Sequence, residues 1–157
     1  MKGNEKMLEH LNLRLAEELT AVNQYMVHSE MCENWGYERL HKSIEKRAFV
    51  EMRHAEKLIA RILFLEGRPN VSTLNKINIG TEVQAMHTND LGAEDEALKG
   101  YNLSIRVATE VGDAGTRKLL ESLLKEEEDH IDELEAQLDQ IKQMGLQNYL
   151  VEQVRGS

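Results

Sequence analysis

The sequence predicts an all-α protein, with two antiparallel helical hairpins joined by a long crossover and a short fifth helix at the end. Three observations lead to this prediction. Strand-forming material is scarce, since aromatic residues make up 4% of the chain. Apolar residues recur at helical spacing through four long segments. The connection between the second and third segments is long, whereas the other connections are short.

The first hairpin is predicted over residues 4–65. Its first helix covers about 4–34 and is broken by Trp35-Gly36, and its second covers about 38–65 and ends before Gly67 and Pro69. Each helix carries one apolar stripe. The stripes are Leu8, Leu11, Leu15, Leu19, Val22 and Met26 on the first helix, and Ile44, Ala48, Ala55, Leu58, Ile62 and Leu65 on the second.

The second hairpin is predicted over residues 83–144, with helices at about 83–111 and 116–144 and a turn marked by Gly112 and Gly115. Gly145 ends the fourth helix, and residues 146–154 form the short fifth helix. Residues 66–82 form the crossover, which spans up to about 55 Å when extended. Because a helix of 27 residues is only about 40 Å long, the crossover can return along the bundle.

Length and composition predict a single domain over residues 1–157 and exclude several classes of protein. The net charge of −9 argues against nucleic acid as the main partner, because phosphate binding needs a basic surface. No stretch is apolar enough for a membrane span, and the opening residues lack the apolar run of a signal peptide. The single Cys32 cannot form an internal disulfide, which favours a reducing compartment. We therefore expect a cytoplasmic protein.

Six polar residues interrupt the apolar stripes and are predicted to point into the bundle. They are Glu18, Glu51, His54, Glu94, Glu127 and His130. Four of them form two Glu-x-x-His motifs, and residues three apart share a helix face. One such motif is weak evidence, because glutamate is common on helices. Two motifs, each accompanied by a lone inward glutamate, are much more specific.

The six candidates also repeat at a constant interval. Each of the three in the second hairpin lies 76 positions after its counterpart in the first, and Tyr25 and Tyr101 are separated by the same interval. The chain therefore reads as a pseudo-twofold repeat of one hairpin, with the six side chains at its centre.

Two divalent metal ions would explain four inward carboxylates, which otherwise repel one another and lose several kcal/mol each on burial. Four carboxylates and two imidazoles suit iron or manganese. We expect Glu51 and Glu127 to bridge the two ions. Glu18 and His54 would complete one position, and Glu94 and His130 the other. The alternative is a solvated charged face, since residues 126–129 are all acidic.

Met52 is predicted to point about 100° away from the core, because it follows Glu51 directly. With Phe49 and Ile59 it forms an outer apolar line, which is typical of a subunit interface. A thioether there can be an axial haem ligand, with two copies enclosing one haem across a twofold axis, although most interface methionines only pack. The remaining histidines lack a partner at ligand spacing and are expected at the surface or at helix ends; they include His10, His28, His41 and His87.

Longer strings of sequence are more specific than these motifs. They are MKGN at the start, Asn23-Gln24-Tyr25, Asn34-Trp35-Gly36, residues 61–67, Asn78-Ile79-Gly80, Glu127 with residues 129–132, and residues 144–150. On these strings the chain resembles bacterioferritin over essentially its whole length. Two hairpins joined by one crossover are also the arrangement of ferritin-like four-helix bundles.

The resemblance implies a hollow homo-oligomeric shell of twenty-four subunits built from twofold dimers, with one b-type haem per dimer. The six candidates match the family's iron ligands, and Met52 matches its haem ligand. Each subunit would then hold two iron ions in a ferroxidase centre and oxidise Fe(II) with oxygen or hydrogen peroxide. Ferric mineral would be stored in the cavity and released when electrons arrive through haem. A small ferredoxin delivers those electrons in some members.

The chain departs from the family pattern on the inner surface. Some bacterioferritins hold an extra iron there, on a His and an Asp that align with Lys46 and Val50, and Arg47 stands where an acidic residue is often found. A metal cation binds poorly beside two cationic side chains. We therefore expect iron to pass directly from the ferroxidase centre into the cavity; iron beside Lys46 in Fe(II)-soaked crystals would contradict this.

Other functions fit parts of the pattern. A di-iron peroxidase of the rubrerythrin type would need a Cys-x-x-Cys module, and the chain has one cysteine. A manganese catalase would not require the large shell. A DNA-protecting mini-ferritin usually places its iron ligands between subunits and lacks the fifth helix. The last alternative is a structural bundle without metal.

Overall fold

The computed structural model describes residues 1–155 and confirms the all-α fold class, with no strand in that part of the chain. Its helices are α1 (Glu5–Asn34), α2 (Glu38–Phe64), α3 (Val83–Glu110), α4 (Ala114–Met144) and α5 (Leu146–Gln153). The boundaries lie within two residues of the predicted ones. The largest difference is the start of α4, where the Asp113 side chain caps the helix by accepting a hydrogen bond from the Thr116 amide.

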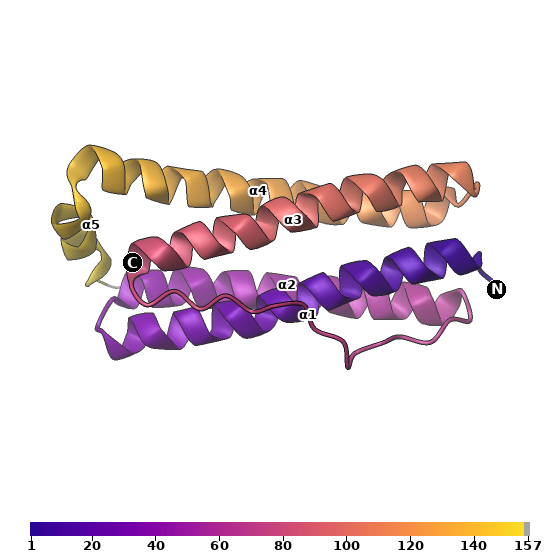
Figure 1. Ribbon diagram of the computed structural model, residues 1–157, viewed down its shortest axis with the longest axis horizontal. Helices are drawn as coiled ribbons and strands as arrows, with labels where there is room; N and C mark the ends of the chain where they lie inside the picture. The colour runs from indigo at the N-terminus through magenta and orange to yellow at the C-terminus, as the bar shows by residue number, and fades with distance from the viewer. Residues whose placement is uncertain (156–157) are drawn as a thin grey trace.

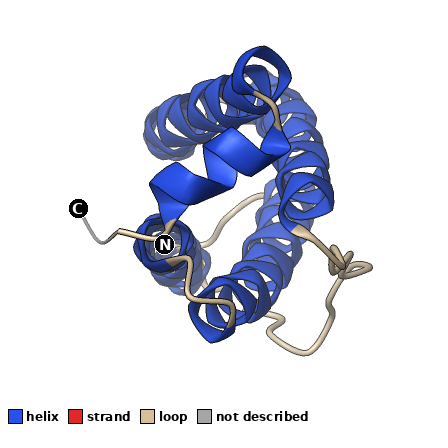
Figure 2. Ribbon diagram, turned by 90° about the vertical axis from the view of Figure 1, so that its left-hand side faces the viewer, coloured by secondary structure: helices blue, strands red, loops and turns tan. Residues whose placement is uncertain are grey.

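The helices pair as the loop lengths predict. α1 packs against α2 and α3 against α4, while α1 also packs against α3 (Figure 1). The crossover runs back along the bundle, so that α3 begins at the end where α2 begins. The end view in Figure 2 shows the four long helices around a common axis, with α5 lying across one end. Among the described residues, no helix combines the length and the apolarity needed to cross a membrane.

The two hairpin turns have the same conformation, which carries the repeat from the sequence into the backbone. Gly36 and Gly112 lie 76 positions apart and have φ angles of 81° and 75°. Glycine adopts this left-handed conformation without the steric cost that a Cβ atom brings. In each turn the next amide also bonds back to the helix it leaves, Tyr37 to the Cys32 carbonyl and Asp113 to the Ala108 carbonyl.

The core consists of two apolar clusters separated by a polar layer. The first cluster, toward the α1 N-terminus, contains Met7, Leu11, Leu58, Ile62 and Leu120 among others. The second cluster, toward α5, contains Tyr25, Leu40, Ile44, Met86 and Tyr149 among others. Between them lie the six inward polar residues of the predicted site. Burial of the two clusters, at about 25 cal/mol per Å² of apolar surface, holds the four helices around that polar layer.

A polar ladder on α1 fixes the crossover to the bundle. Thr20, Gln24 and His28 lie at successive turns of one helix face, and their side chains accept the backbone amides of Asn75, Asn78 and Gly80 at 2.8–3.0 Å. An extended segment has no internal backbone ladder, so these bonds provide partners for amides that are otherwise unpaired. The ladder thereby sets where α3 begins.

Asp90 on α3 is the buried acceptor at which this ladder meets the core. Its carboxylate accepts from Gln24 Nε2 and His28 Nδ1, both at 2.9 Å, and pairs with the Arg47 guanidinium at 3.3 Å. Both side chains of the ion pair are almost fully buried. The ion pair thus joins α2 to α3, and Gln24 and His28 connect it to α1 and to the crossover.

The first prediction concerns this buried ion pair. Asp90→Ala leaves the Arg47 charge buried without its partner, a change that typically costs about 3–5 kcal/mol. We expect a loss of that size in the free energy of unfolding, measured by urea denaturation of the metal-free protein at constant protein concentration.

Asp95→Ala is the matched control, because Asp95 is an exposed aspartate on the same helix. We expect it to change stability by no more than about 0.5 kcal/mol. A loss of less than about 1 kcal/mol in the free energy of unfolding of the Asp90 variant would show that the buried ion pair does not stabilise the fold as predicted.

Candidate metal centre

The structure brings all six predicted site residues together midway along the bundle. Each is at most 8% exposed, and each of the four long helices contributes at least one. Glu18 comes from α1 and Glu94 from α3, while α2 and α4 each supply one Glu-x-x-His pair. The helical repeat accounts for this placement, because residues three apart on one helix face the same neighbour. The solvated-face alternative is therefore wrong for these six side chains.

The six residues form two overlapping groups in which the ligand atoms lie within 4.8 Å of one another. One group contains Glu18 and His54, and the other contains Glu94 and His130. Glu51 and Glu127 belong to both groups. Two adjacent positions that share two carboxylates are the arrangement expected for two bridged metal ions.

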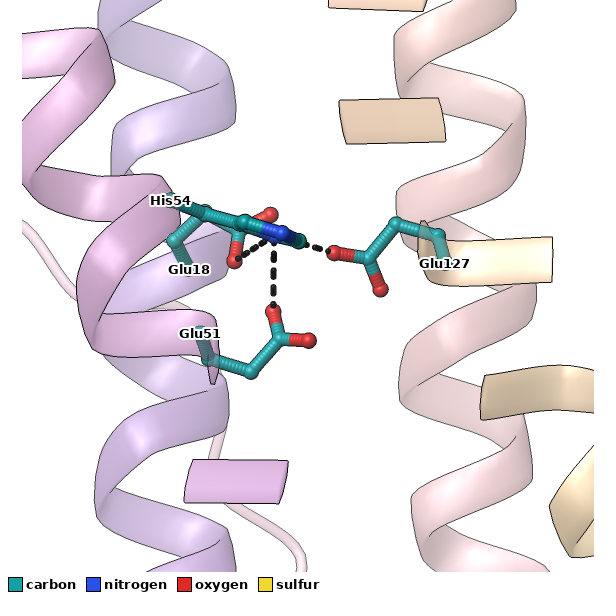
Figure 3. A group of neighbouring side chains, drawn as sticks. All are labelled: Glu18, Glu51, His54 and Glu127. Atoms are coloured by element: carbon teal, nitrogen blue, oxygen red, sulfur yellow. Dashed lines mark hydrogen bonds and ion pairs between the residues drawn. The ribbon is translucent and has the colours of Figure 1, made fainter. Parts of the chain in front are cut away.

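His54 lies at the centre of the first group (Figure 3). Its Nδ1 atom faces inward and lies 2.9 Å from Glu127, 3.4 Å from Glu18 and 3.8 Å from Glu51. Its Nε2 atom faces outward and lies 2.7 Å from the Glu126 carboxylate. Since that carboxylate only accepts, Nε2 carries a proton and the inward nitrogen is the one available to a metal.

His130 occupies the equivalent place in the second group. Its Nδ1 atom also faces inward and lies 2.9 Å from Glu51, 3.4 Å from Glu94 and 3.8 Å from Glu127. The closest of these contacts is not aligned as a hydrogen bond, so both Nδ1 and the facing Glu51 oxygen lack a hydrogen-bond partner. The two imidazoles thus present the same nitrogen to the centre.

Unpaired ligand atoms test whether a metal fits here. One buried oxygen on each of the four central glutamates has no hydrogen-bond partner. A buried carboxylate oxygen without a partner costs about 1–3 kcal/mol or more, and native proteins contain few of them. These oxygens and Nδ1 of His130 belong to the residues of the two groups. The donor set therefore fits two divalent cations, which would provide the unpaired oxygens with a partner.

Two tyrosines orient the outer glutamates. Tyr101 donates a hydrogen bond of 2.6 Å to Glu18, and Tyr25 donates one to Glu94. Each bond crosses from one hairpin to the other, and both tyrosines are fully buried. Their interval of 76 residues in the sequence is therefore reproduced as a pair of equivalent contacts at the site.

The four carboxylates divide into two kinds by their pKa. Burial, followed by repulsion from the neighbouring carboxylates, raises the pKa of Glu51 and of Glu127 well above the usual value. Burial acts in the same direction on Glu18 and Glu94, but their hydrogen bonds to the neighbouring carboxyls and imidazoles outweigh it and lower the pKa. In the metal-free centre the shared carboxylates therefore retain protons.

The imidazoles respond to the same negative field. Burial lowers the pKa of each, but the close carboxylates outweigh it and raise the pKa of His54 to about 11 and that of His130 to about 9. Glu127 and Glu18 act on His54, while Glu127 and Glu94 act on His130. At neutral pH both rings hold protons that a metal would have to displace.

An apolar groove opens on the outside of α1 and α2. It is lined by Val22, Met26, Phe49 and Met52, with Ala48 at its base and Glu30 and Glu45 at its edge. The predicted outward placement of Met52 is confirmed at 42% exposure.

Met26 was predicted on the inward stripe and is instead exposed in this groove, because Met26 directly follows the buried Tyr25 and turns outward. Ile59 differs as well, since it packs against the core.

Three of the four other histidines, His28, His41 and His87, are buried, so the expected surface placement is wrong for them, although His41 lies in the first turn of α2, at a helix end as expected. His28 belongs to the Asp90 network, and His41 Nδ1 bonds the Ser29 carbonyl at 3.1 Å. His87 Nε2 lies 2.9 Å from the Tyr149 hydroxyl, which docks α5 on the bundle, and burial lowers the pKa of His87 to about 4. Their polar partners lie on other segments, so ligand spacing along one helix gave no signal.

Lys46 and Arg47, the two cationic side chains expected on the inner surface, have different environments. Lys46 is exposed and lines a surface pocket beside His130, together with Lys42, Val50, Glu126 and Asp129. Arg47 also reaches that pocket but is 5% exposed, since its guanidinium pairs with Asp90 and lies over the Tyr25 ring at 4.5 Å from the centroid. Arg47 is therefore part of the core and does not act as a free surface charge.

Comparison with known proteins gives consistent results. Residues 8–144 match the model of the ferritin-like domain. The chain is 42% identical over 149 residues to "Bacterioferritin" of Rhodobacter capsulatus and to "Bacterioferritin" of Brucella melitensis, covering 95% of this chain and 92% of each relative. It is 39% identical over 149 residues to "Bacterioferritin" of Mycolicibacterium paratuberculosis, covering 95% and 94% of the two chains.

The second prediction follows from the protons held in the metal-free centre. Because the raised pKa values keep His54 and His130 protonated at neutral pH, metal binding must release protons. Higher pH removes this competition, so Zn(II) affinity should rise between about pH 6 and pH 8, by roughly tenfold per pH unit for each proton released. Calorimetric titration in two buffers of different ionisation enthalpy measures the number of protons.

His10→Gln serves as the control, since it removes an imidazole that lies in none of the candidate metal-binding groups and should leave the proton count unchanged. A binding enthalpy that is the same in both buffers for the unmodified protein would contradict the prediction.

Proposed function

The chain belongs to the bacterioferritins, a family of ferritin-like proteins, and from that premise we propose that it oxidises Fe(II) at a di-iron centre within each subunit and stores the Fe(III). One observation carries the proposal: two groups of buried ligand atoms share Glu51 and Glu127. Storage requires a closed container, so we also propose a hollow cytoplasmic shell of twenty-four copies of this chain, built from twofold dimers.

In this proposal Glu51 and Glu127 would hold both ions, since they belong to both groups of ligand residues. Glu18 and His54 complete one position, and Glu94 and His130 complete the other. A set of four carboxylates and two imidazoles favours iron or manganese, whereas zinc is selected by sites rich in thiolates. The single Cys32 is not among the proposed ligands. Its thiol contacts the Met86 sulfur at 3.9 Å in the second apolar cluster.

The reaction transfers two electrons from two Fe(II) ions to one molecule of hydrogen peroxide, which takes up two protons and gives two waters. With oxygen as acceptor, the same two electrons and two protons give hydrogen peroxide. The chain's own contribution is electrostatic, because four carboxylates stabilise the higher charge of Fe(III) more than that of Fe(II). Tyr25 and Tyr101 hold Glu94 and Glu18 in place, and the two apolar clusters limit access of water.

The groove on α1 and α2 supports a second cofactor. We assign it to one half of a haem b site, which the Met52 thioethers of two subunits related by a twofold axis would hold. The groove offers an apolar wall of Val22 and Phe49 and the thioethers of Met26 and Met52, which suits a flat apolar porphyrin and a neutral sulfur ligand. Haem there supplies a route for electrons that reduce stored Fe(III), with a small ferredoxin as the proposed donor.

The third prediction tests the di-iron centre. Glu18→Ala removes one carboxylate from the first position and should lower the initial rate of Fe(II) oxidation by tenfold or more, since even residues outside the ligand sphere change activity by about 10–100-fold. The rate is followed by absorbance of the ferric product, and size-exclusion chromatography checks that assembly is intact.

Glu9→Ala is the matched control, because Glu9 is an exposed glutamate on the same helix. It should oxidise Fe(II) at the rate of the unmodified protein. An unchanged rate in the Glu18 variant would remove the proposed centre from the reaction.

The fourth prediction separates haem from iron oxidation. Met52→Leu keeps the apolar wall of the groove but removes the thioether, so we expect loss of the haem Soret band from the large particle seen by size-exclusion chromatography. Initial Fe(II) oxidation should stay within about twofold of the unmodified rate, because Met52 and Glu51 point to different faces of α2. Loss of haem and of oxidation together would show that the two sites are not separate.

A further inference from the structure

The pseudo-twofold repeat relates the two metal positions, and their immediate ligands match in kind. Several side chains around those ligands differ between the halves, and two of the differences bear on the hydrogen bonds of the ligands. The position 76 residues before Glu126 is Val50, and the position 76 residues after Arg47 is Leu123. The same backbone arrangement therefore presents two ligand sets with different surroundings.

The difference at Glu126 and Val50 acts on the imidazoles. Glu126 accepts a hydrogen bond of 2.7 Å from His54 Nε2. This bond fixes the ring and increases the electron donation of its inward nitrogen. Val50 lines the pocket beside His130 but offers no acceptor, and within residues 1–155 no side chain hydrogen-bonds His130 Nε2. His54 is therefore the stronger donor of the two rings.

The difference at Arg47 and Leu123 acts on the outer glutamates. The Arg47 guanidinium lies 4.5 Å from the centre of the Tyr25 ring, and Tyr25 donates to Glu94. A cation over the ring strengthens that donation and draws charge away from Glu94. Leu123, the counterpart of Arg47, is a buried member of the first apolar cluster and carries no charge. Since Asp90 partly compensates Arg47, the larger contribution comes from Glu126 and Val50.

We propose that the two metal positions are unequal, and that Glu126 is the positioning residue that makes the Glu18–His54 position fill first and hold its ion more tightly. The Glu94–His130 position is the weaker one and fills second. This inference rests on the proposed di-metal centre and adds an order of filling to it. The direct contact between Glu126 and His54, without a counterpart at His130, carries it.

The test is a titration of the iron-depleted, assembled protein with Co(II), followed by calorimetry and by the visible absorption of bound Co(II). The unmodified protein should bind two ions per subunit in two steps. Glu126→Val removes the outer acceptor of His54 and should weaken the first step by about 10–100-fold, so that the steps merge at low affinity. Val50→Glu supplies the missing acceptor and should tighten the second step by a similar factor.

Two controls separate the hydrogen bond from general effects. Glu128→Val removes an exposed charge close by on α4 and should leave both steps unchanged. Glu126→Asp keeps a carboxylate and should restore most of the first-step affinity.

Each outcome is decisive. Binding of two ions in a single step by the unmodified protein would overturn the order of filling while leaving the proposed centre intact. Equal isotherms for Glu126→Val and Glu128→Val would overturn the role of Glu126. Fewer than two ions at saturation in the unmodified protein would instead contradict the proposed di-metal centre.

Discussion

The rest of the structure depends on one electrostatic conflict, the burial of four carboxylates in a single layer between two apolar clusters. Charged groups are buried only where partners compensate them, because desolvation costs several kcal/mol per ion. Without metal the layer compensates itself partly with protons, which is why the pKa values of Glu51 and Glu127 are raised and both imidazoles are held protonated. The two divalent cations of the proposed centre would neutralise the four carboxylates, so the same energetics that destabilise the metal-free layer would favour metal binding.

A repeated hairpin is an efficient way to build such a layer. The equivalent turns at Gly36 and Gly112 place equivalent ligands at one level of the bundle, and the crossed contacts of Tyr25 and Tyr101 tie each half to the other. Identical halves would give identical sites. The sequence breaks the symmetry just outside the ligands, and the inferred order of filling rests on this difference in surroundings.

The α2 helix separates two tasks by direction alone. Glu51 points into the metal layer, while the next residue, Met52, points into the groove on the outer face. A third face of the same helix carries Lys46 and Val50 toward the pocket beside His130. Neighbouring residues on one rigid helix thus reach the proposed iron centre, the proposed haem site and the pocket beside His130, with fixed distances between them.

The sequence by itself determined the number of helices, the two hairpins, the crossover and the six inward side chains. It could do so because helical periodicity and the 76-residue interval are properties of the chain read in order. It also placed Met52 on the outer face. Only the tertiary structure decided that His28 and Arg47 are buried at Asp90, that Met26 faces outward, and that Glu126 reaches His54 but has no counterpart at His130. These contacts join residues from different segments, and a partner supplied by another helix or by the crossover leaves no periodic signal on the helix that receives it.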